Sequence, residues 1–169
     1  SPALFLPPLL MPLFFFVAFA GGLSAIDQAP GFDYPAGYTA FEFGFVLLQA
    51  AAFGGVFTGF SIAADFQFGF GRRLLLATPN RTALILGYGF VSMVRAAITL
   101  AVVTAVGLAA GMEVLGSGTE IVGLYLLAAI VNIAGTLFAA GIALRFRSLQ
   151  ATPLMMLPTF LFLFLAPVY

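Results

Sequence analysis

Residues 41–63 read FEFGFVLLQAAAFGGVFTGFSIA, a long apolar run whose one charged residue is Glu42. A helix rises 1.5 Å per residue, so about 20 apolar residues cross the hydrocarbon core of a bilayer. This run is long enough, and we expect it to form a transmembrane helix. Small residues recur in it at every fourth position, at Ala51, Gly55, Gly59 and Ala63. Such a face lets another helix approach closely, either as static packing or as a sliding surface.

The composition of the whole chain agrees with a membrane location. The 169 residues are 63% hydrophobic and only 7% charged, and their mean hydropathy is +1.16. Soluble domains carry about 25% charged residues. Six arginines and six acidic residues cannot cover a soluble domain of this size with polar groups, so apolar surface must face lipid.

Several classes of function are disfavoured by what the chain lacks. The net charge is zero and the basic residues are few, which argues against nucleic acid as a partner. Without Cys or His, the chain lacks thiolate nucleophiles, the commonest general base and the usual transition-metal ligands. Ser61, Asp65 and Tyr125 are scattered candidates for a membrane-embedded enzyme and form no recognisable arrangement, so we expect no catalytic site, cofactor or metal in this chain.

Hydropathy separates five apolar stretches in all. They lie near residues 3–23, 41–63, 83–111, 121–143 and 153–169. We therefore expect a single-domain, all-α, polytopic transmembrane bundle over residues 1–169. Because the chain opens at Ser1 without a Met and stops at Tyr169 inside an apolar run, we expect it to be truncated at both ends, and no signal peptide is predicted.

The charges of the four connecting loops alternate in sign. The first loop holds Asp27 and Asp33, the second Asp65, Arg72, Arg73 and Arg81, the third Glu113 and Glu120, and the fourth Arg145 and Arg147. Arginine tends to remain on the cytoplasmic side, while acidic residues contribute little to orientation. We therefore expect the second and fourth loops, and the N-terminal side of the first span, to be cytoplasmic.

Three residues inside the predicted spans are polar enough to need an explanation. Arg95 falls deep in the third span, where a charge costs roughly 2.5–3.5 kcal/mol on insertion scales. It would make a structural ion pair, clamp a carbonyl group or contact a substrate. Asn132 and Thr136 lie one turn apart in the fourth span, where they would join helices or line a polar path.

A row of small residues in the third span, Ala97, Ala101, Ala105 and Ala109, predicts a second packing face.

The second loop, residues 65–81, reads DFQFGFGRRLLLATPNR. Gly69 and Gly71 allow a tight bend, residues 72–77 can form a short helix, and Pro79 ends it. An amphipathic helix flanked by arginines suits the membrane interface or a groove on a partner protein.

With this loop the chain resembles the membrane subunit of type-2 ABC exporters, especially the bacterial drug and antibiotic resistance permeases of the daunorubicin-exporter kind. The matching segments are PAL at 2–4 with PLFFF at 12–16, DYPAGY at 33–38, GFSIAAD at 59–65, GRRLL at 71–75 through Arg81, AGTLF at 134–138, LRFRS at 144–148 and FLAPVY at 164–169. Members of that family usually have six spans, of which five would be visible here, and a further N-terminal interfacial helix.

The resemblance implies that the second loop couples the permease to a cytoplasmic ATPase. The residues implied are Gly69, Arg72, Arg73, Leu74, Leu75, Pro79 and Arg81. Leu74 and Leu75 would make the apolar docking contact, and Arg72 and Arg73 would form a charged rim or contact lipid phosphate, unless they only set topology.

The resemblance also implies the rest of the transporter. A second permease copy or a paralogue would complete it in the bacterial plasma membrane, and it would export a drug, lipid or glycoconjugate. The chain has no phosphate-binding loop, so ATP and Mg²⁺ would bind the partner. A channel, an ion-coupled secondary transporter or a structural subunit remains possible from the residues alone. The acidic residues lie in loops or at span ends, which favours an external motor.

Overall fold

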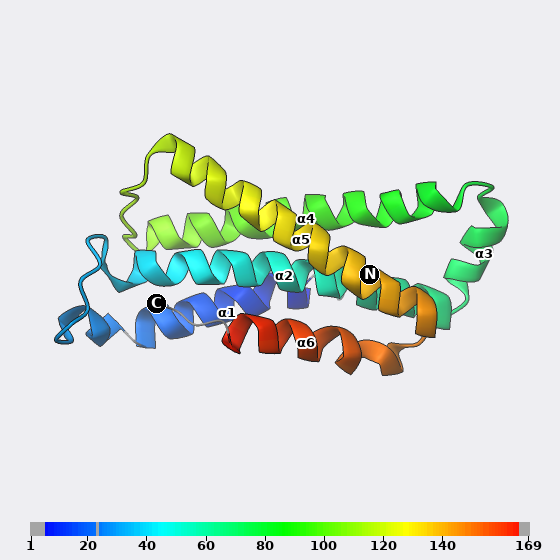
Figure 1. Cartoon of the computed structure of the whole chain (residues 1–169), viewed down its shortest axis with the longest axis horizontal. Helices are drawn as coiled ribbons and strands as arrows, with labels where there is room; N and C mark the ends of the chain where they lie inside the picture. Colours follow the sequence, from blue (N-terminus) through cyan, green and yellow to red (C-terminus); the bar gives the residue numbers. More distant parts are fainter. Residues whose placement is uncertain (1–5, 23, 166–169) are drawn as a thin grey trace. The chain divides into compact units, whose positions relative to one another are not determined.

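The computed structural model describes residues 6–22 and 24–165, which form helices and no strand. The elements are α1 (Leu6–Gly22), the 3₁₀ helix η2 (Ser24–Gln28), α2 (Gly37–Gln67), α3 (Phe70–Ala77), α4 (Arg81–Ala109), α5 (Gly118–Phe146), the 3₁₀ helix η3 (Leu149–Ala151) and α6 (Thr152–Leu165) (Figure 1). The expected all-α class is confirmed.

Three helices, α2, α4 and α5, are long and apolar enough to cross a membrane. They have 31, 29 and 29 residues, so each extends over 40 Å at about 1.5 Å per residue, beyond the roughly 30 Å of hydrocarbon. The spans predicted at 41–63, 83–111 and 121–143 fall on these helices. Helices α1 and α6 are apolar but shorter, and the outermost parts of the spans predicted at 3–23 and 153–169 lie outside the described residues.

The chain divides into two compact units. Unit 1 contains Ser1–Ala50 and Ala97–Ala128, and unit 2 contains Ala51–Ala96 and Ala129–Tyr169. Helices α2, α4 and α5 therefore each contribute residues to both units. The connections that carry Asp33 and Glu113, and the first turn of α5 with Glu120, belong to unit 1, whereas both arginine-bearing connections belong to unit 2.

In unit 2, α2 and α5 pack with their backbones in close contact. A Cβ atom added to Gly55 would lie 2.5 Å from the backbone nitrogen of Thr136, and one added to Gly135 would lie 2.9 Å from the carbonyl oxygen of Ala52. A Cβ at Gly59 would lie 2.5 Å from that of Ala139. The predicted small-residue face of span two is confirmed as a packing face, because only small residues permit this approach.

Helix α6 completes the core of unit 2. Met155 is fully buried in a cluster that also contains Phe66, Ala139 and Ala143. The ring of Phe160 lies 5.7 Å from that of Phe53 on α2. The backbone N–H of Leu149, at the start of η3, donates to the Gln67 side-chain oxygen at 2.8 Å. Apolar packing and one hydrogen bond thus tie the end of the described chain to α2.

Unit 1 is built on aromatic contacts. Phe16 of α1 is almost fully buried, and its ring centre lies 6.2 Å from that of Phe43 on α2. The hydroxyl groups of Thr104 on α4 and Tyr125 on α5 are hydrogen-bonded to each other. One pocket of unit 1 is lined by both of its connections, including Tyr34 and Glu113. The connection that precedes α2 and the connection between α4 and α5 therefore line the same pocket.

The second predicted packing face is not covered by another helix of the described chain. Ala97, Ala101, Ala105 and Ala109 are all exposed on α4. The buried face of this part of α4 contains Thr99, Leu100, Val103 and Gly107 instead. Alanine is compatible with lipid as well as with a helix interface, so a spacing of four does not decide which face is covered.

The packing of α2 on α5 predicts that an added methyl group lowers the stability of the protein at Gly55 but not at Gly44. Gly55→Ala should lower the free energy of unfolding by about 1–3 kcal/mol, because its Cβ meets backbone atoms that cannot rotate away. The control is Gly44→Ala on the same helix, where nothing lies within 4 Å of the added Cβ and helix propensity rises equally. Thermal unfolding in detergent, followed by circular dichroism, measures both. Equal midpoints for the two variants would contradict the close packing.

Candidate functional site

Helix α3 is held in place by two glycines. Gly69 has a φ of +84°, a left-handed conformation that glycine adopts without strain, and α3 begins directly after it. A Cβ at Gly71 would lie 2.9 Å from the Phe66 ring, so this glycine lets α3 pack on the end of α2. The helix ends at Ala77, and the N–H of the next residue, Thr78, donates to the Leu74 carbonyl at 3.0 Å, just before Pro79. The short helix predicted over residues 72–77 is confirmed and begins two residues earlier, so the bend is at Gly69 while Gly71 lies inside the helix (Figure 1).

The side chains of α3 divide between the core and the outside. Leu75 packs against the core cluster of unit 2, and Leu74 is half-buried. Leu76 is 90% exposed, and Phe68 and Phe70, which precede it by eight and six residues, are also exposed. The sequence reasoning selected Leu74 and Leu75 and missed these three residues. The docking role of Leu74 and Leu75 stays a prediction, and the most exposed apolar side chain of α3 is Leu76.

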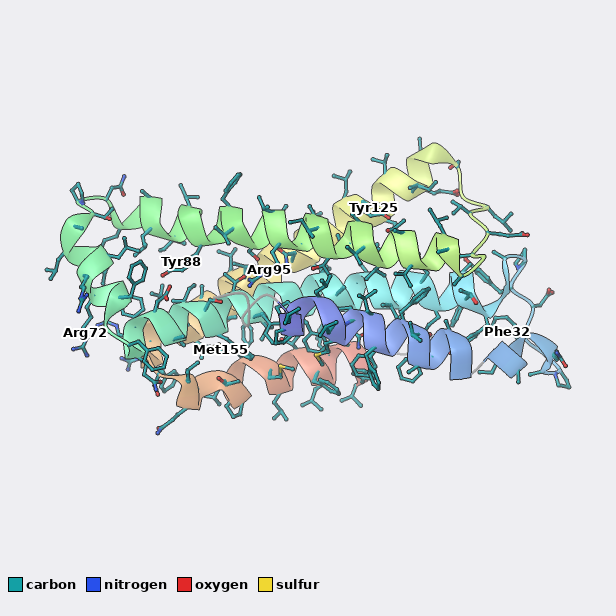
Figure 2. All side chains as sticks on the ribbon, turned by 180° about the vertical axis from the view of Figure 1, so that it is seen from behind. Phe32, Arg72, Tyr88, Arg95, Tyr125 and Met155 are labelled. Carbon is teal, nitrogen blue, oxygen red and sulfur yellow. The ribbon has the colours of Figure 1, made fainter. Side chains whose placement is uncertain are left out.

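The two arginine-bearing connections meet at one end of unit 2. Arg72 of α3, Arg81 at the start of α4 and Arg147 after α5 line a pocket of about 550 Å³ together with apolar side chains. We call it the arginine pocket; its apolar lining is Phe66, Leu75, Leu76, Leu84, Ile85 and Leu144. Arg72 and Arg73 are exposed, and Figure 2 shows Arg72 projecting outward from α3. Two loops predicted to share one side of a membrane thus share one surface.

Arg95 is the most buried charged residue described. It lies midway along α4, about 21 Å from either end, and is only 6% exposed. Its guanidinium donates to the Gly54 carbonyl oxygen at 3.4 Å and to the Thr58 hydroxyl, both on α2 (Figure 2). Among residues 6–22 and 24–165 no carboxylate pairs with it, and its Nε has no hydrogen-bond partner. Of the two structural roles predicted, the carbonyl clamp is the one observed.

Asn132 and Thr136 of α5 join three helices. The Asn132 Nδ2 donates to the Ala51 carbonyl oxygen at 2.9 Å, and its Oδ1 accepts a hydrogen bond from Ser92 at 3.2 Å. The Ser92 hydroxyl also lies 2.8 Å from that of Thr136. The predicted helix-joining role is confirmed for both residues.

Together these side chains form a polar cluster inside unit 2. Its members are Thr58, Ser92, Arg95, Asn132 and Thr136. Sequence reasoning missed Thr58 and Ser92. Ser92 precedes Arg95 by three residues and so shares its helix face, which was the available signal.

An apolar cleft of about 480 Å³ lies along α4 and α5 in unit 2. Its apolar lining includes Ile62, Leu84, Ile85, Leu86, Phe90, Met93, Ile133, Leu137, Ala140 and Leu144. The polar side chains that line it are Tyr88, Asn132 and Thr136. The Tyr88 hydroxyl donates to the Asp65 carboxylate at 2.6 Å. Asp65, at the end of α2, is therefore tied to α4.

The three side chains considered as catalytic candidates each have a local hydrogen-bond partner. No group of three or more potential metal ligands occurs among residues 6–22 and 24–165. Ser61 donates to the Phe57 carbonyl, Asp65 accepts from Tyr88, and Tyr125 bonds Thr104, so each of the three candidate catalytic side chains has a separate local partner. Comparison of the chain with protein families, curated proteins and solved structures gives no match. Its function must therefore be argued from its own residues.

The clamp on Arg95 predicts a specific stability loss. Thr58→Val keeps the shape of the side chain but removes a hydroxyl that receives a buried charged donor, which should cost about 1–3 kcal/mol of unfolding free energy. Ser61→Ala is the control on the same helix, because its hydroxyl bonds only the carbonyl of Phe57 one turn earlier. Denaturant unfolding in mixed micelles measures the difference. A Thr58→Val protein no less stable than Ser61→Ala would show that Arg95 does not depend on this contact.

Proposed function

We propose that this chain is the permease subunit of an ATP-driven membrane exporter and that α3 docks into a cytoplasmic ATPase. The observation that carries the proposal is α3 itself, a short helix that packs within unit 2 through one face and exposes Leu76 together with Arg72 and Arg73 on the other. Leu75 and Gly71 anchor it, while Leu76, Phe68 and Phe70 are exposed. Such a surface suits a groove on a partner protein as well as the membrane interface.

The position of α3 suits the transmission of force. It directly connects α2 and α4, two of the helices long enough to cross a membrane. A movement imposed on α3 by a motor would therefore act on both helices at once. Rigid-body movement of packed helices is a common way to open and close a transport path. ATP and Mg²⁺ would bind the motor, because this chain carries no phosphate-binding loop.

The remaining parts of the proposal follow the resemblance described above. The arginine-bearing connections would face the cytoplasm of a bacterial cell, and a second permease copy or a paralogue would complete the pathway. The cargo would be hydrophobic or amphipathic, such as a drug, a lipid or a glycoconjugate. Gly69, Arg72, Arg73, Leu74, Leu75, Pro79 and Arg81 would form the coupling element, with Leu76 added as its most exposed apolar side chain.

An ion-coupled transporter or channel is the second candidate, and Arg95 favours it. A buried charge midway along a span-length helix is a common mark of ion or substrate pathways. The two candidates differ in energy source. Transport by membrane vesicles that stops with vanadate supports the motor, whereas transport driven by an ion gradient without ATP supports the second candidate.

Docking through α3 predicts a selective loss of the complex. Leu76→Asp should abolish copurification of an ATPase subunit with the tagged chain, because it places a charge at the centre of the apolar contact. Leu115→Asp is the control, since Leu115 is also exposed but lies in the connection between α4 and α5. The complex is isolated from native membranes, identified by mass spectrometry and assayed for ATP hydrolysis. Retention of the ATPase by the Leu76→Asp chain would refute docking through this surface.

A further inference from the structure

The arginine pocket and the apolar cleft are neighbours within unit 2, because Leu84, Ile85 and Leu144 line both. We call the two together the groove. It is cationic at the end beside α3 and apolar along α4 and α5. We propose that it binds one anionic phospholipid, with the headgroup phosphate at the three arginines and an acyl chain in the cleft.

The charge of the arginine pocket fits a phosphate group. Arg72, Arg81 and Arg147 come from three different elements, and no acidic side chain lines the pocket. Guanidinium groups offer several N–H donors in a planar arrangement that matches phosphate oxygens. Three such groups around one pocket leave positive charge to be neutralised by a ligand.

Arg147 is oriented before any ligand binds. Its guanidinium carbon lies 5.3 Å from the centre of the Phe66 ring, and its Nε donates to the Leu144 carbonyl at 3.2 Å. Arg73 and Arg145 are exposed nearby in sequence but do not line the pocket. The pocket therefore uses a subset of the loop arginines, which is more specific than a general positive charge at the membrane surface.

The apolar cleft fits a hydrocarbon chain better than a polar ligand. Each polar side chain that lines it already has a hydrogen-bond partner in unit 2: Tyr88 bonds Asp65, and Asn132 and Thr136 both bond Ser92. A polar ligand in the cleft would therefore lose its own hydrogen bonds to water without replacement from these side chains.

The rim of the cleft is open to the surroundings. Leu86, Phe90 and Leu137 are exposed along it. In a bilayer these residues would face lipid, so an acyl chain could enter sideways while its headgroup stays at the arginine pocket. The inference needs only a membrane location and does not depend on a motor protein.

Binding of a phosphatidylglycerol with a fluorescent acyl chain to the purified chain in zwitterionic micelles tests the headgroup contact. We expect unlabelled phosphatidylglycerol to compete at far lower concentration than phosphatidylcholine or inorganic phosphate. The double variant R72Q/R81Q should weaken binding by roughly fivefold for each arginine, as expected for basic residues at an anionic lipid surface. The control R73Q/R145Q removes equal charge outside the pocket and should weaken binding far less than R72Q/R81Q does.

Two glycines of α4 test the acyl-chain contact independently. A Cβ at Gly87 or Gly89 meets nothing within 4 Å, so both accept a side chain, but only Gly89 lines the cleft. Gly89→Leu should weaken binding severalfold and Gly87→Leu should not, with helical circular dichroism confirming that both fold. Equal binding by the two glycine variants, equal loss in the two arginine pairs, or competition by inorganic phosphate as strong as by phosphatidylglycerol would each overturn the proposal.

Discussion

The close contact of α2 with α5 is the constraint on which the rest of unit 2 depends. Gly55 and Gly135 bring the two backbones together, and a single methyl group at either position would collide with main-chain atoms. In lipid, apolar side chains gain nothing by leaving one apolar environment for another, so helices associate through close packing and hydrogen bonds. The short separation also lets Asn132 reach the carbonyl of Ala51, which adds a polar bond to the packing. Packing and polar contacts therefore act together to set the register of these helices.

The register of α2 and α5 allows unit 2 to bury the charged side chain of Arg95. Arg95 contacts Gly54 and Thr58 on α2, while Ser92 on the same face of α4 contacts Asn132 on α5. A buried guanidinium without acidic partners is tolerated only where oxygen atoms replace water around it. The carbonyl and hydroxyl oxygens of α2 supply that environment. The unpaired Nε–H leaves Arg95 able to donate one further hydrogen bond.

Sequence patterns predicted the positions of the helices better than the contacts between them. Hydropathy located α2, α4 and α5, and glycine and proline placement located α3, because these features depend on neighbours along the chain. The row Ala97 to Ala109 is exposed within this chain, and its spacing alone does not say whether lipid or another protein covers it. Thr58 and Ser92 were missed because their partners lie far away in the sequence, and only the helix register brings them together. Leu76 was missed because the sequence does not show which of the consecutive leucines 74–76 packs against the core and which is exposed.

The account of function requires that the arginine-bearing connections of unit 2 face the cytoplasm. The chain contains no Cys, so one introduced cysteine reports the side on which it lies. Asn80→Cys marks the connection beside α3, and Ser117→Cys marks the exposed connection between α4 and α5. Both are treated with a membrane-impermeant maleimide in right-side-out vesicles, before and after permeabilisation. Labelling of Ser117→Cys in sealed vesicles, with labelling of Asn80→Cys only after permeabilisation, is the predicted result. Labelling of Asn80→Cys in sealed vesicles would contradict the orientation and, with it, docking to a cytoplasmic motor.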